Sequence, residues 1–215
     1  MKAVRVITIS REYGSGGAAI GGELARSLGW KLLDRELILE LARRAHVRPS
    51  EVSQLDEHAS SFVERVLRAF WLGNAYVWSG PAPEVVDSDY LAALSAIVIR
   101  EAAKLGQCVI VGRGAQCVLR GDEAAFHVFV YGSREEKLRR IQSRHRTLPE
   151  CEMALDEIDG TRAAYIHSYY GCDWADRHLY NLMINSDIGI NRAVSLILNA
   201  TALTAARETL VPQLK

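Results

Sequence analysis

Cysteine is scarce in this sequence, which has four among 215 residues, and no two of them form a Cys-x-x-Cys pair. No grouping of cysteine and histidine has the spacing of a zinc site, so neither a structural zinc nor a disulfide framework is expected to organise the fold. We predict no metal-ligating set of side chains. The thiols are expected to be reduced and structural, as is usual for proteins of the cytoplasm.

An excess of either charge is also missing, because 26 Lys and Arg residues balance 26 Asp and Glu residues. A protein that coats a nucleic-acid polymer or an anionic membrane normally has a basic excess, so neither partner is expected. Small phosphorylated ligands remain compatible with this balance, since they need only a few local cations. No apolar run approaches the ~18 residues that span a bilayer, and residues 1–10 do not form a signal peptide. We therefore expect a cytoplasmic protein.

Apolar residues make up 49% of the chain, which is enough to bury the core of a single domain. Short β-branched runs predict strands, and amphipathic patterns between them predict helices. The predicted strands are residues 4–9, 30–33, 108–111, 126–131 and 182–184. This alternation is typical of a three-layer α/β fold with a parallel sheet, whose ligands bind at the carboxyl ends of the strands. Residues 50–87 and the basic residues 134–146 depart from the alternation.

The loop after the first predicted strand is rich in glycine, with Gly14, Gly16 and Gly17 just before a helical pattern. A strand, a glycine loop and a helix N-terminus together form an anion site, because glycine permits positive φ angles and several N–H groups converge. Two phosphate-binding patterns compete here. Gly14-x-Gly16-x-x-Ala19 fits the dinucleotide fingerprint, with Asp34 about 20 residues later as a ribose-binding acid. The length of the loop instead favours a P-loop around a β-phosphate, and a purely structural turn is the third reading.

Residues 11–18 keep only part of the P-loop pattern Gly-x-x-x-x-Gly-Lys-[Ser/Thr]. Arg11 stands at the first glycine, Gly17 at the lysine and Ala18 at the hydroxyl position. Backbone N–H groups can still cradle phosphates, but the lysine charge and the usual magnesium ligand are missing at those positions. Arg11 and Arg35 are the candidates to supply the missing charge.

Longer blocks of sequence run from the first predicted strand to the last. They are Ile-Thr-Ile-Ser-Arg-Glu-Tyr-Gly-Ser-Gly-Gly at 7–17, Leu-Gly-Trp-Lys-Leu-Leu-Asp-Arg at 28–35, Val-Ile-Val-Gly-Arg-Gly-Ala at 109–115, His-Val-Phe-Val-Tyr at 127–131, Arg-Ala-Ala-Tyr-Ile at 162–166, Tyr-Gly-Cys-Asp-Trp at 170–174 and Tyr-Asn-Leu-Met-Ile-Asn at 180–185. Together they resemble the cytidylate-kinase-like family of P-loop proteins over nearly the whole chain.

The resemblance implies a P-loop nucleoside-monophosphate-kinase fold with a five-stranded parallel sheet, in one domain of residues 1–215. Residues 50–87 would form the helical insert that binds the nucleoside monophosphate, and residues 134–149 the lid. The implied reaction is transfer of a phosphoryl group from ATP, with Mg²⁺, to CMP or dCMP. The phosphates of ATP would lie on Gly14, Ser15, Gly16, Gly17 and Ala18.

The resemblance also implies an acceptor site. Arg113 aligns with the arginine of a Gly-Arg-Asp motif that serves the nucleoside monophosphate, although Gly114 here replaces the aspartate. Asp159 and Arg162 resemble an Asp-x-x-Arg pair with the same task. A structural salt bridge of Arg113 and an ordinary intrahelical pair of Asp159 with Arg162 are the alternatives.

Asp34 and Arg35 are grouped with the acceptor site, while Asp34 would equally cap a helix. Tyr165, Tyr169, Tyr170 and Trp174 would stack on a base or pack in the core, and the helical spacing of the first two favours the core.

Three arginines are predicted to be catalytic, since phosphoryl transfer depends on cations around the transferring group. Arg140 and Arg144 lie four residues apart on one helix face beside the expected lid, whereas Arg139 points elsewhere. A solvated helix face, with Glu136 paired to Arg140, is the alternative. Arg11 is expected to serve ATP, and Arg113 the acceptor.

We therefore expect a cytosolic kinase that acts on small nucleotides, and a homodimer remains open. The missing lysine and Ala18 favour a second hypothesis, a nucleotide-binding regulatory or interaction module with little kinase activity. A dinucleotide-dependent oxidoreductase, based on Gly14-x-Gly16-x-x-Ala19, is a third.

Overall fold

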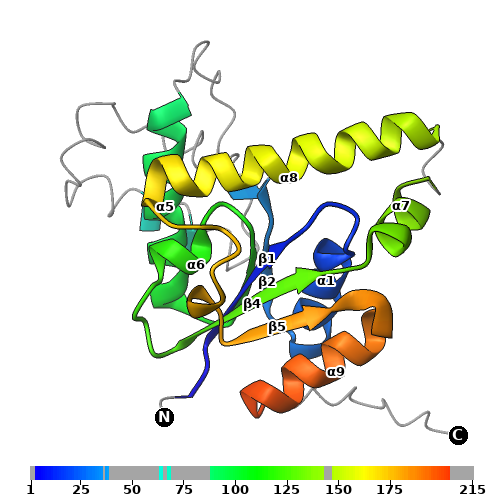
Figure 1. The fold of residues 1–215 in the computed structure, drawn as a ribbon. Helices are drawn as coiled ribbons and strands as arrows, with labels where there is room; N and C mark the ends of the chain where they lie inside the picture. The colour runs from blue at the N-terminus through cyan, green and yellow to red at the C-terminus, as the bar shows by residue number, and fades with distance from the viewer. Residues whose placement is uncertain are drawn as a thin grey trace, which may run out of the picture.

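A parallel sheet organises the protein in the computed structural model, which describes residues 3–35, 37–38, 63–64, 67–68, 88–142 and 147–203. Its five strands follow the order β2-β3-β1-β4-β5, and every neighbouring pair is parallel (Figure 1). The strands are β1 (Val6–Arg11), β2 (Lys31–Leu33), β3 (Cys108–Val111), β4 (Ala125–Tyr131) and β5 (Leu182–Asn185). The predicted α/β fold with a five-stranded parallel sheet is confirmed.

Strand β1 lies at the centre of the sheet, between β3 and β4, and is buried from Val6 to Ser10. Both faces of a central parallel strand are covered, which is why its sequence is almost continuously apolar. The strand was predicted at residues 4–9 and lies two residues later. Pairing with β4 extends it to Arg11, which faces Val130 in the register. Arg11 is therefore held by the sheet rather than by a free loop.

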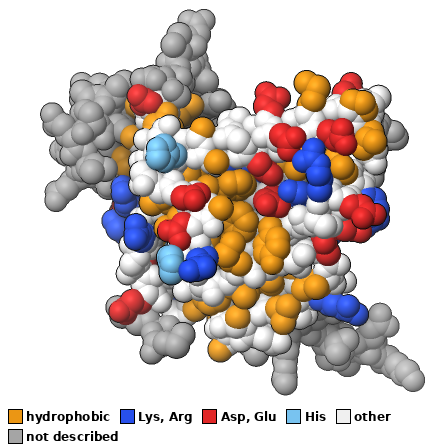
Figure 2. Space-filling model, viewed as in Figure 1, with side chains coloured by type: hydrophobic (Ala, Val, Ile, Leu, Met, Phe, Trp, Pro, Cys, Tyr) orange, Lys and Arg blue, Asp and Glu red, His pale blue; other side chains and the backbone are white. Residues whose placement is uncertain are grey.

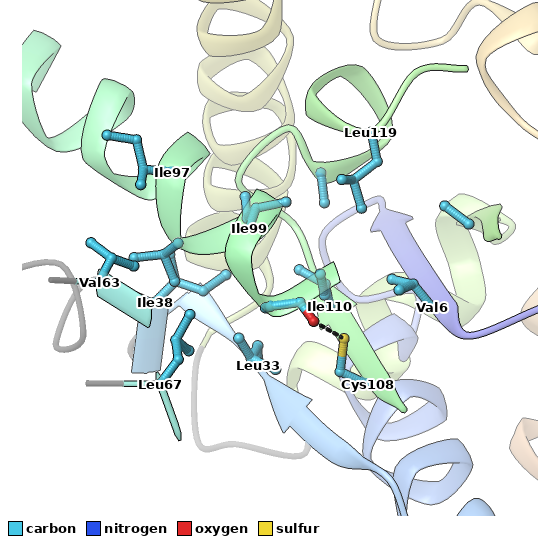
Figure 3. Close-up of a cluster of buried hydrophobic side chains, with 14 of the residues drawn as sticks. Val6, Leu33, Ile38, Val63, Leu67, Ile97, Ile99, Cys108, Ile110 and Leu119 are labelled. Atoms are coloured by element: carbon cyan, nitrogen blue, oxygen red, sulfur yellow. Dashed lines mark hydrogen bonds between the residues drawn. The ribbon is translucent and has the colours of Figure 1, made fainter. Parts of the chain in front are cut away.

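Helices cover both faces of the sheet (Figure 1). Helices α1 (Gly17–Leu28) and α9 (Ile190–Thr201) pack with one set of strand residues, which includes Ile7, Val109 and Val128. Helix α5 (Ser88–Leu105) and the short α6 (Ala115–Val118) pack with the alternate set. Figure 3 shows this second cluster, to which Ile97, Ile99, Ile110 and Leu33 all belong. The alternation of strand side chains between faces creates two cores.

Two helices follow β4. They are α7 (Arg134–Gln142) and the long α8 (Leu148–Tyr170), which crosses above the sheet in Figure 1. Thr147 and Glu150 form a capping box at the start of α8, and Gly171 ends it with a left-handed φ of 63°. Two short 3₁₀ turns, η1 (Arg177–Leu179) and η2 (Ser186–Ile188), flank β5. No helix among the described residues combines the length and apolar character that a membrane span needs.

The structure differs from the predictions at two places, and parts of two further predicted segments lie outside the described residues. Helix α6 was not predicted, because four residues are too few for a periodic pattern. The last helix ends at Thr201, whereas residues 191–207 were predicted, and residues 204–207 lie outside the described part. Of the predicted insert at 50–87 only residues 63–64 and 67–68 are described, and their Val63 and Leu67 are buried in the α5 core. Within the predicted lid, residues 143–146 lie outside the described part.

Candidate functional site

The glycine loop between β1 and α1 presents a concentration of backbone donors. Gly14 and Gly16 have left-handed φ angles of 76° and 80°, and a β-carbon on Gly16 would lie 2.8 Å from Cδ1 of Ile190. Helix α1 begins at Gly17 without a side-chain cap. The N–H groups of the loop and first turn have no acceptor among the described residues at Gly14, Gly16, Gly17 and Ala18. Together with the helix dipole, these donors suit a phosphate.

Ser15, the remaining member of the predicted phosphate loop, is fully buried. Its hydroxyl donates to the Glu12 carbonyl at 2.8 Å and its N–H donates to the same oxygen at 3.3 Å. These bonds fold the loop into a tight turn. No group of three or more His, Cys, Asp or Glu side chains within the described ranges has the arrangement of a metal site.

Lys137 of α7 supports the loop from its outer side. Its side chain is only 10% exposed, and Nζ donates to Oε2 of Glu12 at 2.8 Å. The same carboxylate oxygen accepts from the N–H of Gly132 at 3.3 Å, and Oδ2 of Asp159 lies 4.0 Å from Nζ. Sequence reasoning missed Lys137 and Glu12, since a lysine within a charged helical segment usually lies in solvent.

Arg140 joins the loop to the turn after β5. Its Nη1 donates to the Ser15 carbonyl at 3.1 Å and to Oγ of Ser186 at 2.8 Å, and Nη2 donates to the Ser186 carbonyl at 2.9 Å. Glu136 lies 3.8 Å away, at the distance of a weak ion pair. Arg140 is thus held beside the phosphate loop by neutral oxygens, whereas Arg139 is exposed and pairs with Glu136. Arg144 lies outside the described residues.

Asp159 and Arg162 lie on the face of α8 that meets the loop. Oδ1 of Asp159 accepts from the N–H of Tyr13 at 2.7 Å and from Nη1 of Arg162 at 3.1 Å. Nη1 of Arg162 also donates to the Arg11 carbonyl at 2.9 Å. Burial raises the pKa of the Asp159 carboxyl and lowers the pKa of the Arg162 guanidinium. Interactions in such a desolvated pair are stronger than in water.

Arg11 extends from the end of β1 across the start of α1. A β-carbon on Gly17 would overlap Cβ of Arg11 and lie 2.9 Å from its Cγ. The guanidinium ends against Gly112, where a β-carbon would overlap Nη1 and lie 3.1 Å from Cζ. Arg11 therefore connects the phosphate loop with the carboxyl end of β3.

A cavity of about 260 Å³ lies where the ends of β1 and β3 meet α8. Four guanidinium groups line it, from Arg11, Arg35, Arg113 and Arg162. The Arg113 guanidinium lies 5.1 Å above the ring of Tyr165, within the range of a cation–π contact. The four predicted arginines reach one cavity although they come from widely separated parts of the chain.

Three buried polar atoms of residues along this cavity have no hydrogen-bond partner within the described part of the chain. They are Nε of Arg113, Nε2 of Gln116 and the hydroxyl of Tyr165, and all three residues line the cavity. Gln116 is only 2% exposed. Leaving a buried donor unpaired costs about 1–3 kcal/mol, so three such atoms beside one cavity make it a candidate site for a polar ligand. Sequence reasoning missed Gln116, because it lies in the short helix that was not predicted.

The remaining predicted site residues have other surroundings. Asp34 accepts from the N–H of Leu37 at 2.9 Å and caps the helical turn after β2, and it is not among the residues that line the cavity. Tyr169 donates to Oδ1 of Asp89 at 2.7 Å. Trp174 lines the cavity and packs edge-on against Phe129, with ring centroids 5.3 Å apart.

Exposed carboxylates lie in the N-terminal part of α8, at Glu150, Glu152 and Asp156, and Figure 2 shows Asp and Glu side chains along this helix with hydrophobic side chains below it. Asp156 pairs with Arg134 at 2.9 Å. Glu157 is the acidic residue among those that line the cavity, where four arginines outnumber it, so the cavity suits a small anion.

Comparisons with known proteins agree with this geometry. Residues 6–188 match the sequence model of the cytidylate kinase-like family. The solved structure of an uncharacterized protein from Eubacterium ventriosum is similar, with a TM-score of 0.68 and 20% identity, over 92% of this chain and 98% of that one. Shikimate kinase from Bacteroides thetaiotaomicron has a TM-score of 0.53 and 17% identity, over 94% and 100%. These two likenesses concern the fold alone. A comparison with curated protein sequences finds no match.

Proposed function

The chain belongs to the cytidylate kinase-like family, and from this premise we propose that it transfers a phosphoryl group from ATP to a nucleoside monophosphate, with CMP and dCMP as the leading acceptors. One observation carries the proposal. A loop with unpaired N–H groups lies beside a cavity that holds four arginines and three unpartnered buried polar atoms. Two adjacent anion sites are what transfer between two phosphorylated substrates requires.

The donor site would be the loop of residues 14–18. Backbone N–H groups there would bind the phosphates of ATP, and Arg140 keeps the loop in shape through the Ser15 carbonyl. These donors fit a triphosphate because they are preorganised and cost no reorganisation on binding. A Mg²⁺ ion bound with ATP would supply further neutralisation of phosphate charge, and the Ser15 hydroxyl, which donates to the Glu12 carbonyl, is the candidate ligand within the loop.

The acceptor site would be the arginine-lined cavity. Arg113 and Arg162 would hold the acceptor phosphate, since a guanidinium binds phosphate with two parallel hydrogen bonds. Gln116 and Tyr165 would bind the nucleoside through the polar atoms that lack partners. Oδ1 of Asp159 accepts hydrogen bonds from Arg162 and from the N–H of Tyr13. One carboxylate therefore contacts both the acceptor site and the donor loop.

Catalysis in such a site needs no covalent chemistry from the protein. Positioned cations neutralise the charge that develops on the transferring group, and alignment of the two substrates supplies much of the remaining rate. The arginines of this cavity are placed for that task. We also propose that the protein works in the cytoplasm on small nucleotides, in keeping with its balanced charge.

A coupled assay of ADP release tests the proposal directly. Wild-type protein is given ATP, Mg²⁺ and one acceptor at a time from CMP, dCMP, UMP, AMP and GMP, with an ATP-only reaction as the control. We expect turnover above the control with CMP or dCMP. Turnover only with UMP, AMP or GMP would replace CMP and dCMP as the proposed acceptors. No turnover with any of the five at millimolar concentration would contradict the kinase proposal.

The second candidate is a nucleotide-binding module with little activity. Gly17 and Ala18, which stand at the lysine and hydroxyl positions of the P-loop pattern, favour it. It predicts tight ATP binding in calorimetry beside negligible turnover in the assay above. A turnover near the enzyme median of about 10 s⁻¹ would exclude it.

A further inference from the structure

Positions 11 and 17 have room for only one side chain between them. A β-carbon on Gly17 would overlap Cβ of Arg11 and meet its Cγ at 2.9 Å, and real β-carbons do not approach this closely. Gly17 is the first residue of α1 and stands at the lysine position of the P-loop pattern, while Arg11 stands at its first glycine. A lysine at 17 is therefore incompatible with the arginine at 11.

The backbone of Arg11 cannot move away to relieve this overlap. Arg11 is the last residue of β1, opposite Val130, and the next N–H, of Glu12, donates to the Val130 carbonyl at 3.0 Å. The carbonyl of Arg11 accepts from Nη1 of Arg162 at 2.9 Å. The direction of its side chain across the start of α1 is thus set by the sheet on one side and by α8 on the other.

The guanidinium of Arg11 reaches the boundary between the two proposed substrate sites. Cζ of Arg11 lies 3.1 Å from the position that a β-carbon on residue 112 would take. Gly112, with a φ of 83°, has no β-carbon, so the guanidinium fits in that space. Arg11 and Arg162 line the cavity, whereas Lys137 and Arg140, which also lie beside the loop, do not. Lys137 is instead paired with Glu12 on the outer side of the loop.

We infer that Arg11 is the functional replacement of the P-loop lysine, with its guanidinium at the phosphoryl group that passes between donor and acceptor. The inference rests on the proposed function and adds to it the residue that supplies the charge. Relative to the P-loop pattern, the cation is moved from the first turn of α1, at position 17, to the end of β1, at position 11. A planar guanidinium can contact two phosphate groups at once, which a lysine ammonium does less well.

A reciprocal exchange tests this assignment. The variants are Arg11→Gly, Gly17→Lys and the double variant Arg11→Gly/Gly17→Lys, which restores the first glycine and the lysine of the P-loop pattern and leaves Ala18 at its hydroxyl position. Arg139→Gln, on the exposed face of α7, is the matched control for loss of an arginine. Each protein is checked by circular dichroism and thermal unfolding, then measured for binding of a fluorescent ATP analogue and for turnover.

We expect Arg11→Gly to stay folded, to bind the analogue more weakly and to lose about a hundredfold in kcat, the effect of removing one positioned charge. Gly17→Lys should lower the unfolding temperature because the two side chains collide. The double variant should recover the unfolding temperature of Arg11→Gly and exceed its turnover at least tenfold. Arg139→Gln should behave as wild type.

Two results would overturn the inference. One is an Arg11→Gly protein with wild-type binding and turnover, and the other is a folded double variant that gains neither binding nor turnover over Arg11→Gly. If the wild type turns over no acceptor, the kinase proposal fails. The role of Arg11 is still decided in that case, because the binding measurements on the same four variants do not depend on turnover.

Discussion

The phenol ring of Tyr170 lies in the space that a β-carbon on Gly114 would occupy, with Cζ of the ring 2.8 Å from that position. The hydroxyl of Tyr170 donates to the Arg113 carbonyl at 3.3 Å, and burial raises the pKa of this phenol. Gly114 itself has a left-handed φ of 72°. Gly114 is therefore matched to the tyrosine at the end of α8, and the pair constrains the backbone beside Arg113.

Gly114→Ala should destabilise the protein for two reasons. The new β-carbon displaces the Tyr170 ring, and the alanine has to keep the left-handed φ of 72°, which is unfavourable for it. We expect a loss of about 1–3 kcal/mol in the free energy of unfolding, measured by urea titration. Gly160→Ala is the control, since Gly160 lies within α8 with nothing within 4 Å, and it should stabilise the protein slightly. Equal stability of the Gly114→Ala and wild-type proteins would contradict the role of the contact.

Arg113→Ala should raise the KM of the acceptor by about tenfold to a hundredfold while the affinity for ATP stays unchanged. The reason is that Arg113 lines the cavity and its guanidinium stacks on the ring of Tyr165 rather than on the glycine loop. Steady-state kinetics with each substrate varied in turn measures the effect, and exposed Arg120→Ala is the control. An effect confined to ATP would assign the cavity to the donor instead.

Arg140→Ala should weaken ATP binding and cost about 2 kcal/mol of stability, because the Ser15 and Ser186 carbonyls lose a charged donor. Arg139→Ala, one residue earlier on the same helix, removes only an exposed pair with Glu136 and should cost less than 0.5 kcal/mol. Calorimetric titration with ATP and urea unfolding measure both variants. If the two variants behave alike, the contacts of Arg140 do not shape the loop.

Lys137→Ala should destabilise the loop by about 2 kcal/mol, because Glu12 is left as a partly buried charge without its cation. The double variant Glu12→Gln/Lys137→Ala should recover part of this loss, since no unpaired charge remains. Arg134→Ala removes one partner of an exposed pair with Asp156 and serves as the control. Urea unfolding of the wild type, Lys137→Ala, Glu12→Gln and the double variant gives the coupling energy, and a coupling near zero would show that the pair contributes nothing.

Alkaline pH should destabilise the protein through Cys108. Burial raises the pKa of this thiol from its ordinary value of 9.0 to about 12. Above pH 9 the unfolded chain releases the thiol proton while the folded protein keeps it, so the free energy of unfolding falls as pH rises, by at most about 1.4 kcal/mol per pH unit for this group. Burial also raises the pKa of Cys117 to about 12, which adds to the effect.

Urea unfolding at pH 8, 9 and 10 measures this pH dependence. Cys108→Ala should give a shallower decline than wild type, whatever its absolute stability, because one linked proton is removed. Parallel declines of the two proteins would contradict the assignment to Cys108.

Local patterns in the sequence predicted much of this protein. The apolar runs predicted five strands within two residues of their observed ends, because burial on both faces requires such runs. The glycine spacing predicted an anion loop, since left-handed φ angles and converging N–H groups depend on residues within a few positions of one another. Helical spacing likewise predicted that Asp159 and Arg162 share a face.

Contacts between distant residues were decided by the tertiary structure alone. Lys137 meets Glu12 across 125 positions, and Gln116 enters the cavity on a four-residue helix that has no pattern of its own. Asp34, expected among the acceptor residues, caps its own helical turn. The packing of α1 against the end of β1 made Arg11 and Gly17 compete for one space. Sequence periodicity reports which face of an element is buried, whereas the partner that buries it depends on how the strands are ordered in the sheet.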